Sequence, residues 1–245
     1  GPDRMQVNFW HVTRNVIARE KVMYDGHAVA AVAALDAATA RAAAAAIEVK
    51  YEVLPHVIDV DDAMAPNAPL LFDDMLTRGV DPAPATPSNV AKRVGFNMGD
   101  VDNAFTKADH VIERHYKTQP IHQGYIEAQA CLANWTDGKA EVWTCTQGHF
   151  AVRNLTAKLV GLPIGQVKVT ASEIGGGFGG KTVVYLEPLA VVLSRKSGAP
   201  VRMRMSREDV FRATGLTSGS SMSVKIGINN DGTIDNDGTI HNFHN

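Results

Sequence analysis

Cysteine is scarce in this sequence, and the cysteines present do not form a metal-binding pattern. The 245 residues contain only Cys131 and Cys145, with no CxxC pair and no histidine-rich neighbourhood. A zinc site or an iron–sulfur cluster ligated by this chain is therefore excluded, because both need clustered thiolate or imidazole ligands. We expect no metal-ligating residue in this chain.

An excess of positive charge and a long apolar run are also missing. The formal net charge is −2, so there is no basic field that would favour nucleic acid as a partner. The longest apolar stretch, near 28–46, is interrupted by Asp36 and Arg41, whereas a membrane span needs about 20 apolar residues. The N-terminal residues lack the pattern of a secretory signal. We therefore expect a cytoplasmic protein without a membrane span.

The first 54 residues predict a small α/β unit within a chain whose 45% hydrophobic content is typical of folded proteins. The apolar run Ala28–Ala34 is interpreted as a strand. Asp36 is placed to cap a helix that runs to about Ile47, since alanine and arginine are strong helix formers. Alternating polar and apolar residues predict a second strand over Glu48–Leu54.

A proline-rich segment follows this unit. Six prolines occur between residues 55 and 92, at positions 55, 66, 69, 82, 84 and 87. Proline removes a backbone donor and fixes φ, so regular structure is expected to be sparse here. A connector of this length indicates a segment wrapped over a partner surface, or a boundary between two units.

A β-hairpin is predicted further along the chain. The Asp-Gly pair at 137–138 is a two-residue turn signal between a strand over 130–136 and a return strand over 139–146. In the register of such a turn, Cys131 faces Thr144. The two cysteines then point to opposite faces of the hairpin, and we expect both to be buried free thiols.

The other expected elements follow from periodicity and from cap residues. Val152, Leu155 and Leu159 lie at helical spacing, and Gly161 is expected to end that helix. Ser206 is expected to cap a short helix. In chain order these elements are a strand over 110–118, a helix over 148–160, a strand over 166–170, a helix over 182–195, a strand over 201–205, a helix from 206 to 211 and a strand over 220–228.

The segment EIGGGFGGK at 173–181 is the most informative feature of the sequence. Together with Thr182 it satisfies the P-loop pattern, in which Lys181 reaches phosphates and Thr182 holds magnesium. The glycines at 175, 177 and 180 also satisfy the dinucleotide-binding fingerprint. A third interpretation is a flexible surface turn without a ligand.

The surroundings of the loop oppose both nucleotide patterns. A P-loop domain needs a downstream apolar parallel strand ending in an acid, but the candidate VRMRMSRED alternates arginine with apolar residues. A dinucleotide site needs an acid about 20 residues after the glycines, where Pro200 stands. Glycine is also entropically costly, so five glycines around Phe178 indicate a backbone that approaches a ligand closely, with Phe178 as an apolar wall.

Together with three other segments, the loop resembles the molybdenum hydroxylases, the family of xanthine dehydrogenase and aldehyde oxidase. HQGYIEAQAC at 122–131 resembles the family's His-x-x-x-(Ile/Leu)-Glu segment. WTCTQGHFAVRNLTAKLVGLPIGQVKV at 143–169 resembles its Thr-Gln helix and the strand that follows. The segment from 16 to 55 resembles the end of the small domain that precedes the molybdenum domain. The resemblance covers about residues 14–235, and Gln147 stands 31 residues before Phe178, as the family pattern expects.

The resemblance implies an α+β fold in three parts. Residues 1–54 are expected to be the C-terminal part of a small α/β hammerhead-like domain, 55–93 a proline-rich connector, and 94–245 the first half of a mixed α+β molybdopterin-binding domain. The complete enzyme is expected to hydroxylate an aldehyde, aromatic or N-heterocyclic carbon of a small molecule, using water. The implied cofactor is molybdopterin with molybdenum, in its cytosine dinucleotide form. The implied partners are the second half of the molybdenum domain and the subunits or segments that carry [2Fe–2S] clusters and FAD.

The resemblance also implies which residues contact the cofactor. Gln147 is expected to hydrogen-bond an oxo ligand of molybdenum, while the backbone near Phe178 and Gly179 packs beside it and loop N–H groups face the pterin and its phosphate. For His122 and Glu127 two roles stay open, namely structural hydrogen bonding or shaping a substrate channel. The implied cofactor-binding residues are Gln147, Gly148, Gly176, Gly177, Phe178 and Gly179.

Departures from the family pattern limit these expectations. Thr182 stands where purine-oxidising members carry an acid that binds the substrate ring, so a purine substrate is disfavoured. The family's catalytic glutamate lies near the end of a longer subunit, so we assign no catalytic residue and expect this chain alone to be inactive. The motif Asp-Gly-Thr-Ile occurs at 231–234 and again at 237–240, which favours a fragment over a subunit split between two chains. The alternatives are a P-loop nucleotide-binding protein and a non-catalytic scaffold fragment.

Overall fold

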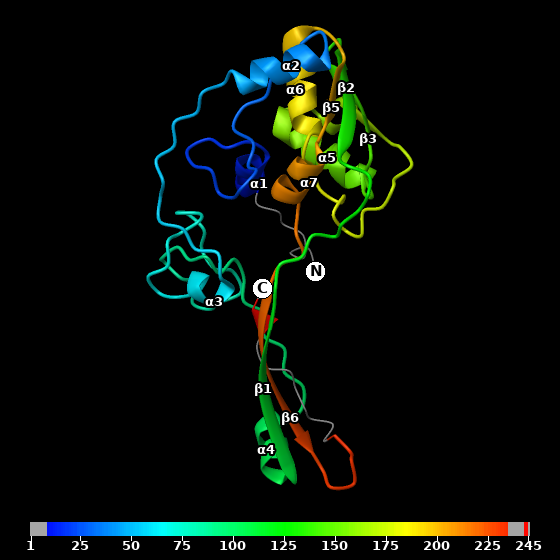
Figure 1. The fold of residues 1–245 in the computed structure, drawn as a ribbon. Coiled ribbons are helices and arrows are strands. Elements are labelled where there is room, and N and C mark those ends of the chain that lie inside the picture. The colour runs from blue at the N-terminus through cyan, green and yellow to red at the C-terminus, as the bar shows by residue number, and fades with distance from the viewer. Residues whose placement is uncertain (1–8, 235–242, 245) are drawn as a thin grey trace. The chain divides into compact units, whose positions relative to one another are not determined.

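The computed structural model describes residues 9–234 and 243–244, and the chain divides into two compact units. The first unit combines Gly1–Lys50 with His122–Leu216, and the second combines Tyr51–Ile121 with Thr217–Asn245. Each unit is therefore built from two separate stretches of sequence (Figure 1).

The elements of each unit are short and are joined by long irregular segments. In the first unit they are α1 (Phe9–Val16), α2 (Ala37–Ala45), β2 (Ala130–Thr136), β3 (Lys139–Thr144), α5 (His149–Val160), the 3-10 helix η2 (Ile164–Gln166), β4 (Val167–Ala171), α6 (Glu187–Ser197), β5 (Val201–Arg204) and α7 (Arg207–Ala213). In the second unit they are α3 (Val60–Ala63), α4 (Val101–Lys107), β1 (His110–Thr118), β6 (Ser220–Ile228) and β7 (Phe243–His244).

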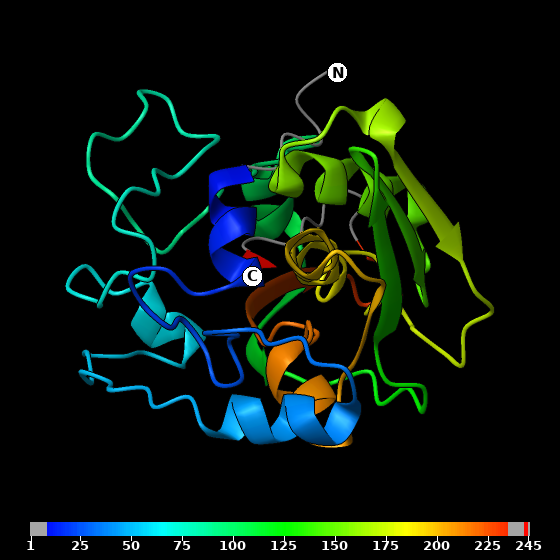
Figure 2. The ribbon, with the colours of Figure 1, turned by 90° about the horizontal axis from the view of Figure 1, so that it is seen from above.

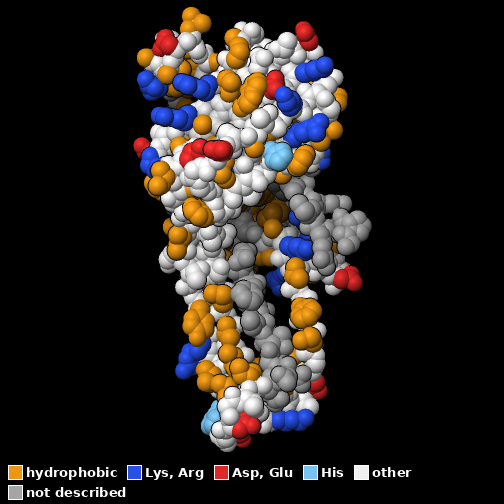
Figure 3. Space-filling model, turned by 90° about the vertical axis from the view of Figure 1, so that its right-hand side faces the viewer, with side chains coloured by type: hydrophobic (Ala, Val, Ile, Leu, Met, Phe, Trp, Pro, Cys, Tyr) orange, Lys and Arg blue, Asp and Glu red, His pale blue; other side chains and the backbone are white. Residues whose placement is uncertain are grey.

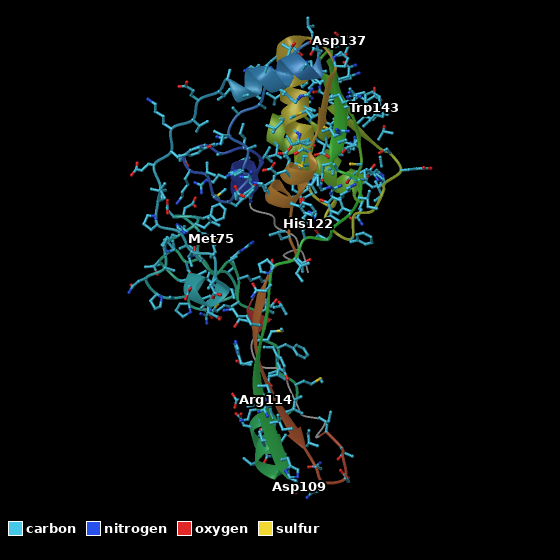
Figure 4. The ribbon with its side chains drawn as sticks, in the orientation of Figure 1. Met75, Asp109, Arg114, His122, Asp137 and Trp143 are labelled. Atoms are coloured by element: carbon cyan, nitrogen blue, oxygen red, sulfur yellow. The ribbon has the colours of Figure 1, made fainter. Side chains whose placement is uncertain are left out.

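A mixed sheet with the strand order β4-β3-β2-β5 forms the centre of the first unit. Strand β2 is antiparallel to β3 and β5, whereas β3 and β4 are parallel. Both turn residues of the β2–β3 hairpin have positive φ, 50° at Asp137 and 76° at Gly138, as a type I′ turn requires. Figure 4 shows Asp137 at this turn and Trp143 on β3. The predicted register is confirmed, because Cys131 pairs with Thr144.

Helices α5 and α6 pack against one face of this sheet and share its core (Figures 1 and 2). Ala133, Val142 and Val201 occupy neighbouring positions on three strands, so their side chains lie on the same face. On the opposite face Leu132 and Trp143 face each other across the hairpin and stay 36% exposed. One face of the sheet is therefore covered by helices, and the other reaches the surface in the described residues.

Strands β1 and β6 form a long antiparallel ribbon in the second unit, running from the pair His110–Ile228 to the pair Thr118–Ser220. Every residue of β1 is exposed. Figure 3 shows apolar side chains lying among charged ones on the surface of the molecule. The first Asp-Gly-Thr-Ile copy, at 231–234, follows β6 as a turn in which Asp231 accepts two hydrogen bonds from Thr233. The second copy, at 237–240, lies outside the described residues.

The proline-rich connector has little regular structure, as predicted. Between 55 and 92 the described elements are α3 and one isolated bridge between Arg78 and Lys92. The Asn89 side chain makes three hydrogen bonds to backbone groups between residues 63 and 71. Long connectors without helices or strands need such side-chain bonds, because their backbone groups have no ladder to join.

Two strands predicted near the N-terminus are wrong. Neither Ala28–Ala34 nor Glu48–Leu54 forms a strand, and Tyr51 and Val53 are 63% and 86% exposed. A strand needs a neighbour that bonds its N–H and C=O groups, and no described segment pairs with either stretch. The intervening helix is confirmed as α2, with the Asp36 carboxylate accepting two backbone hydrogen bonds at its start.

The helix predicted over 182–195 begins later than the sequence indicated. Helix α6 starts at Glu187, and residues 182–186 belong to the preceding loop. Pro188 explains the shift, because proline is tolerated in the first turn of a helix and not in its interior. The Glu187 carboxylate then accepts the Tyr185 N–H and the Thr144 hydroxyl, which ties the start of α6 to the loop and to β3.

The two cysteines are buried free thiols, as predicted. Burial raises the pKa of the Cys131 thiol well above its usual range and also raises the pKa of Cys145. Thiols in this state are poor nucleophiles and poor metal ligands, since the thiolate is the reactive form. No described helix has the length and apolar character needed to cross a membrane.

The core of the first unit predicts a sharp difference between two neighbouring residues of α6. Val191 is 1% exposed, whereas Val192 is 42% exposed. We expect Val191→Ala to lower the free energy of unfolding by about 2 kcal/mol through a cavity, and Val192→Ala to change it by less than about 0.5 kcal/mol. Urea unfolding of both variants measures this difference. Equal effects of the two substitutions would contradict the packing of α6 on the sheet.

Candidate functional site

The candidate site lies where two neighbouring parallel strands, β3 and β4, end. In the β3–β4 ladder Thr144 lies opposite Ala171, so the chain leaves both strands at the same edge of the sheet. Gln147 follows β3 and directly precedes the Gly148 N-cap of α5. The glycine loop follows β4. Two segments far apart in sequence are thus brought to one edge by the sheet order.

The glycine loop has an unusual backbone conformation. Gly176 and Gly179 have φ values of +92° and +89°, and Phe178 between them has φ +48°. Glycine adopts such angles without a steric penalty, whereas a bulky residue does so rarely and with strain. The Phe178 side chain is 74% exposed. The loop therefore holds an aromatic side chain outward in a conformation that its flanking glycines permit.

The Gln147 side chain contacts this loop directly. Its Oε1 accepts hydrogen bonds from the N–H groups of Gly179 at 3.0 Å and Lys181 at 3.3 Å. The Gln147 N–H in turn donates to the Lys181 carbonyl at 2.9 Å. The predicted convergence of Gln147 with the loop is therefore confirmed. Because the amide oxygen is occupied as an acceptor, the NH2 group remains as the donor, and it has no partner among the described residues.

At the points of closest approach a β-carbon would force a neighbouring side chain to move. A β-carbon at Gly177 would lie 2.4 Å from Oε1 of Gln147, and one at Gly180 would lie 2.8 Å from the Tyr125 ring. Both distances are shorter than real side-chain contacts. Gly148 lies at the start of α5, a helix with no side-chain cap and no acid in its first turn. The N–H of Gly148 donates to the Thr146 hydroxyl at 3.0 Å, whereas the first N–H groups of α5 itself have no capping side chain.

Lys181 does not behave as a phosphate-binding lysine. Its side chain is 1% exposed, and its Nζ lies 2.6 Å from Oε2 of Glu127 and 4.9 Å from the Tyr125 ring centroid. Thr182 donates its hydroxyl proton to the Gly179 carbonyl. Helix α6 begins five residues after Thr182, and β5 pairs antiparallel with β2. The structure therefore opposes the P-loop interpretation and, since no helix opens at the glycines, the dinucleotide one.

Glu127 and His122 both make structural hydrogen bonds. The Glu127 carboxylate accepts from the Gly175 N–H at 3.0 Å as well as from Lys181. Nδ1 of His122 accepts from the Gly124 N–H at 3.0 Å, and the ring packs edge-on against Phe211. Figure 4 labels His122 where the chain enters the segment that leads to β2. Of the two roles left open from the sequence, the described contacts favour structural bonding.

The protonation of His122 follows from its partners. Thr214 gives its hydroxyl proton to the Val210 carbonyl at 2.7 Å, so at 2.9 Å it accepts from Nε2 of His122. Since Nδ1 is already an acceptor, the histidine is neutral and carries its proton on Nε2. Burial, followed by the positive charge of Arg207, lowers the pKa of His122.

Several residues of this region were not singled out from the sequence. Tyr125 is 1% exposed, and its hydroxyl bonds Thr214 and Gln129. Arg207, at the start of α7, donates to the Tyr125 carbonyl at 2.9 Å and also to the Ile126 carbonyl. Tyr125 lies within the segment 122–131 and was within reach of sequence analysis. For Arg207 no local signal exists, because its partners lie more than 80 residues away.

The polar groups that this site presents to a ligand are thus uncharged hydrogen-bond donors. Within the described residues there is no group of three or more histidine, cysteine or acidic side chains that would hold a metal ion directly. What the loop edge offers instead is an oriented carboxamide, backbone N–H groups and the exposed Phe178 ring. The fold and this edge define a mixed α+β domain with a donor-lined glycine loop, which suits a ligand rich in hydrogen-bond acceptors.

Comparison with known proteins identifies the family. Residues 83–236 match the molybdopterin cofactor-binding domain, and residues 2–55 match the a/b hammerhead domain of aldehyde oxidase and xanthine dehydrogenase. The chain belongs to the molybdenum hydroxylase family, of which it represents part of the molybdopterin-binding subunit. The predicted fold class, a hammerhead-like region followed by a mixed α+β molybdopterin-binding domain, is confirmed.

The proteins that are similar to this chain are named for different enzymatic activities. The chain is 30% identical over 239 residues to a probable hypoxanthine oxidase of Escherichia coli, covering 88% of this chain and 25% of that protein. It is 32% identical over 225 residues to the carbon monoxide dehydrogenase large chain of Afipia carboxidovorans, covering 89% of this chain and 28% of that protein. The chain thus spans about a quarter of the length of these relatives.

Solved structures of the family have the same fold. Aldehyde oxidoreductase from Desulfovibrio gigas aligns with a TM-score of 0.68 and 28% identity, over 80% of this chain and 21% of that chain. Carbon monoxide dehydrogenase from Oligotropha carboxidovorans aligns with a TM-score of 0.69 and 28% identity, over 80% of this chain and 25% of that chain.

The geometry of Lys181 predicts that the protein does not bind Mg-ATP. Because the ammonium is buried against Glu127, the loop offers no lysine to phosphates. We expect a millimolar Mg-ATP titration to leave the melting temperature unchanged within about 1 °C, with magnesium alone as the control. A saturable rise in melting temperature with nucleotide concentration would restore the P-loop interpretation.

The hydrogen bonds of His122 predict its titration. We expect the titration midpoint of His122 to lie below the ordinary histidine pKa of 6.5. Protonation at Nδ1 would place two donors, Nδ1–H and the Gly124 N–H, opposite each other. In the unfolded chain the pKa returns to its ordinary value, so this contribution to stability is present above pH 6.5 and is lost as the pH falls below it. NMR titration measures the midpoint, with His122→Gln assigning the resonance. A midpoint above 6.5 would contradict the proposed tautomer.

Proposed function

We propose that this chain binds the molybdenum cofactor within a larger enzyme that hydroxylates an aldehyde, aromatic or N-heterocyclic carbon using water. The cofactor-binding residues of this proposal are Gln147, Gly148, Gly176, Gly177, Phe178 and Gly179. The observation that carries it is the orientation of the Gln147 carboxamide, whose oxygen is held by the Gly179 and Lys181 N–H groups and whose NH2 remains available as a donor.

The residues present suit this cofactor chemically. Molybdopterin presents oxygen and phosphate acceptors, and neutral amide and backbone donors match such groups without adding a competing cation. The absence of an acid in the first turn of α5 also suits an anionic ligand, because a carboxylate there would occupy the same N–H groups. Phe178, which is 74% exposed, would form an apolar wall beside the bound cofactor.

These contacts indicate which roles belong to the cofactor and which belong to this chain. When bound, the cofactor supplies the two-electron oxidation of the substrate carbon. This chain's residues bind and orient it, with Gln147 donating from Nε2 and the loop donating from its backbone. Glu127 is paired with Lys181 and is therefore not placed as a general base. We therefore propose that the base lies elsewhere in the complete enzyme, and that the 245-residue chain alone has no turnover.

The substrate class in this proposal is restricted by Thr182. Its hydroxyl is already bonded to the Gly179 carbonyl at 3.0 Å, and it carries no charge that would bind a purine ring. Relatives named for hypoxanthine oxidation and for carbon monoxide oxidation are 30% and 32% identical to this chain, so identity does not separate substrates. We favour an aldehyde, aromatic or non-purine heterocyclic substrate.

The remaining parts of the proposal concern the complete enzyme. They are the cytosine dinucleotide form of the cofactor, FAD and [2Fe–2S] groups on other chains or segments, the second half of the molybdenum domain as a partner, and a cytoplasmic location. The division of this chain at residues 54 and 93 into hammerhead-like, connector and molybdenum parts belongs to the same proposal. The match of residues 2–55 to the hammerhead domain supports the first boundary.

The loop geometry supplies a matched pair of variants to test cofactor binding. In Gly177→Ala the new β-carbon would meet Oε1 of Gln147 at 2.4 Å, whereas in Gly165→Ala it meets nothing within 4 Å. Neither glycine has a positive φ, so both backbones accept alanine. In the complete subunit we expect Gly177→Ala to lower bound molybdenum and pterin at least about tenfold, which corresponds to about 1.4 kcal/mol, and Gly165→Ala to leave both unchanged.

The measurement is elemental analysis for molybdenum together with fluorescence of the oxidised pterin released by acid. Dye reduction with a panel of aldehydes, aromatic compounds and N-heterocycles then assigns the substrate class. A complete subunit that contains neither molybdenum nor pterin would contradict the proposed function. Full cofactor content in Gly177→Ala would contradict the assignment of Gln147 and the loop.

A further inference from the structure

Both ends of the glycine loop are attached to one carboxylate oxygen. Oε2 of Glu127 accepts the Gly175 N–H at 3.0 Å and the Lys181 ammonium at 2.6 Å. The Glu127 N–H also donates to the Gly175 carbonyl at 3.3 Å. Gly175 and Lys181 are the first and last residues of the segment GGGFGGK. Glu127 therefore closes this segment into a loop of fixed span.

The buried ammonium of Lys181 needs this closure, because the closure brings Glu127 to it as a counter-ion. Its side chain is 1% exposed and lies against the Tyr125 ring, so the charge has no access to water. A buried charge without a counter-ion is strongly disfavoured. Lys181 is therefore drawn inward to Glu127, and its charge is used inside the fold rather than on a ligand.

Hydrogen bonds of the Lys181 main chain connect this ion pair to Gln147. The Lys181 N–H donates to Oε1 of Gln147 at 3.3 Å, and the Lys181 carbonyl accepts from the Gln147 N–H at 2.9 Å and from the Thr146 hydroxyl at 2.9 Å. A change in the position of Lys181 would thus move both the backbone and the carboxamide of Gln147.

Helix α7 holds the segment on which Glu127 stands. Arg207 donates to the carbonyls of Tyr125 and Ile126, immediately before Glu127. The Tyr125 hydroxyl bonds Thr214, which directly follows α7. The carboxylate is therefore fixed from its own backbone as well as by its partners.

We propose that Lys181 and Glu127 are positioning residues for Gln147. Their ion pair closes the loop so that the Gly179 and Lys181 N–H groups hold the Gln147 amide oxygen and direct its NH2 group to the ligand. Neither residue of the pair touches the ligand. The inference rests on the proposed function for the identity of that ligand, whereas the closure itself is a property of the folded chain.

Replacing both charges together separates positioning from stability. In Lys181→Met with Glu127→Gln no unpaired charge remains, so the urea midpoint should stay close to that of the parent. The matched control is Lys168→Met with Glu141→Gln, which removes an exposed pair with the same 2.6 Å separation. Hydrogen–deuterium exchange is measured by mass spectrometry on cofactor-free protein, so that loss of a ligand does not itself expose the loop.

We expect exchange in peptides covering 175–182 to become at least about tenfold faster in the Lys181/Glu127 variant, while α6 and the control variant stay within about twofold of the parent. If the double variant does not fold, Glu127→Gln alone is measured, with at least about threefold faster exchange expected in the same peptides. Unchanged exchange in the loop would overturn the proposal. A uniform increase across α5 and α6 would also overturn it, because it would show a general structural role.

Molybdenum content of the complete subunit is measured in parallel. A parent subunit without molybdenum would contradict the proposed function and leave the exchange result standing. A parent subunit with molybdenum, combined with unchanged loop exchange in the variant, would contradict the positioning role alone. Lower molybdenum content in the Lys181/Glu127 variant than in the Lys168/Glu141 control is the expected result.

Discussion

The close approach of the glycine-loop backbone to its neighbours is the constraint on which the rest of the site depends. A β-carbon at residue 175, 177 or 180 would come within 2.4–2.9 Å of Glu127, Gln147 or Tyr125. Such distances are incompatible with any side chain unless the neighbour moves. The glycines therefore do more than make the loop flexible. They allow the backbone to reach Gln147 closely enough for two N–H groups to hold its amide oxygen.

The pairing of the loop's buried lysine with a carboxylate determines which kind of ligand the loop suits. The same glycine and lysine pattern serves phosphate binding when the lysine is free and a helix opens directly after the loop. Here Lys181 is buried against Glu127, and α6 opens only at Glu187. The edge of the site is left with neutral donors, whose orientation is fixed by the backbone. This difference explains how one short pattern is compatible with two unrelated ligand classes.

The sheet supplies the scaffold that makes these contacts possible. Parallel pairing of β3 and β4 brings the segments after Thr144 and Ala171 to one edge. Helices α5 and α6 then cover one face of the sheet and fix the segments that flank the site. Residues 122–129 reach the same edge, because β2 is antiparallel to β3 and begins at Ala130 beside Cys145. Helix α7 holds them through Arg207. The site is thus assembled from three short irregular segments and from helix α7, which holds one of them.

The sequence by itself determined the features that depend on neighbouring residues. The Asp-Gly turn set the register of the β2–β3 hairpin, Asp36 and Ser206 began their helices, and Gly161 ended α5, because caps and turns are local interactions. The order and spacing of the motifs also indicated the family and the meeting of Gln147 with the loop.

Only the tertiary structure decided the features that depend on distant partners. The strands predicted at 28–34 and 48–54 did not form, because no described segment pairs with them. Whether Lys181 faces a ligand or the interior depends on Glu127, 54 residues away, and the position of Glu127 depends on Arg207, about 80 residues further along the chain. Burial sets the energy of such contacts, and burial exists only once the whole unit has folded.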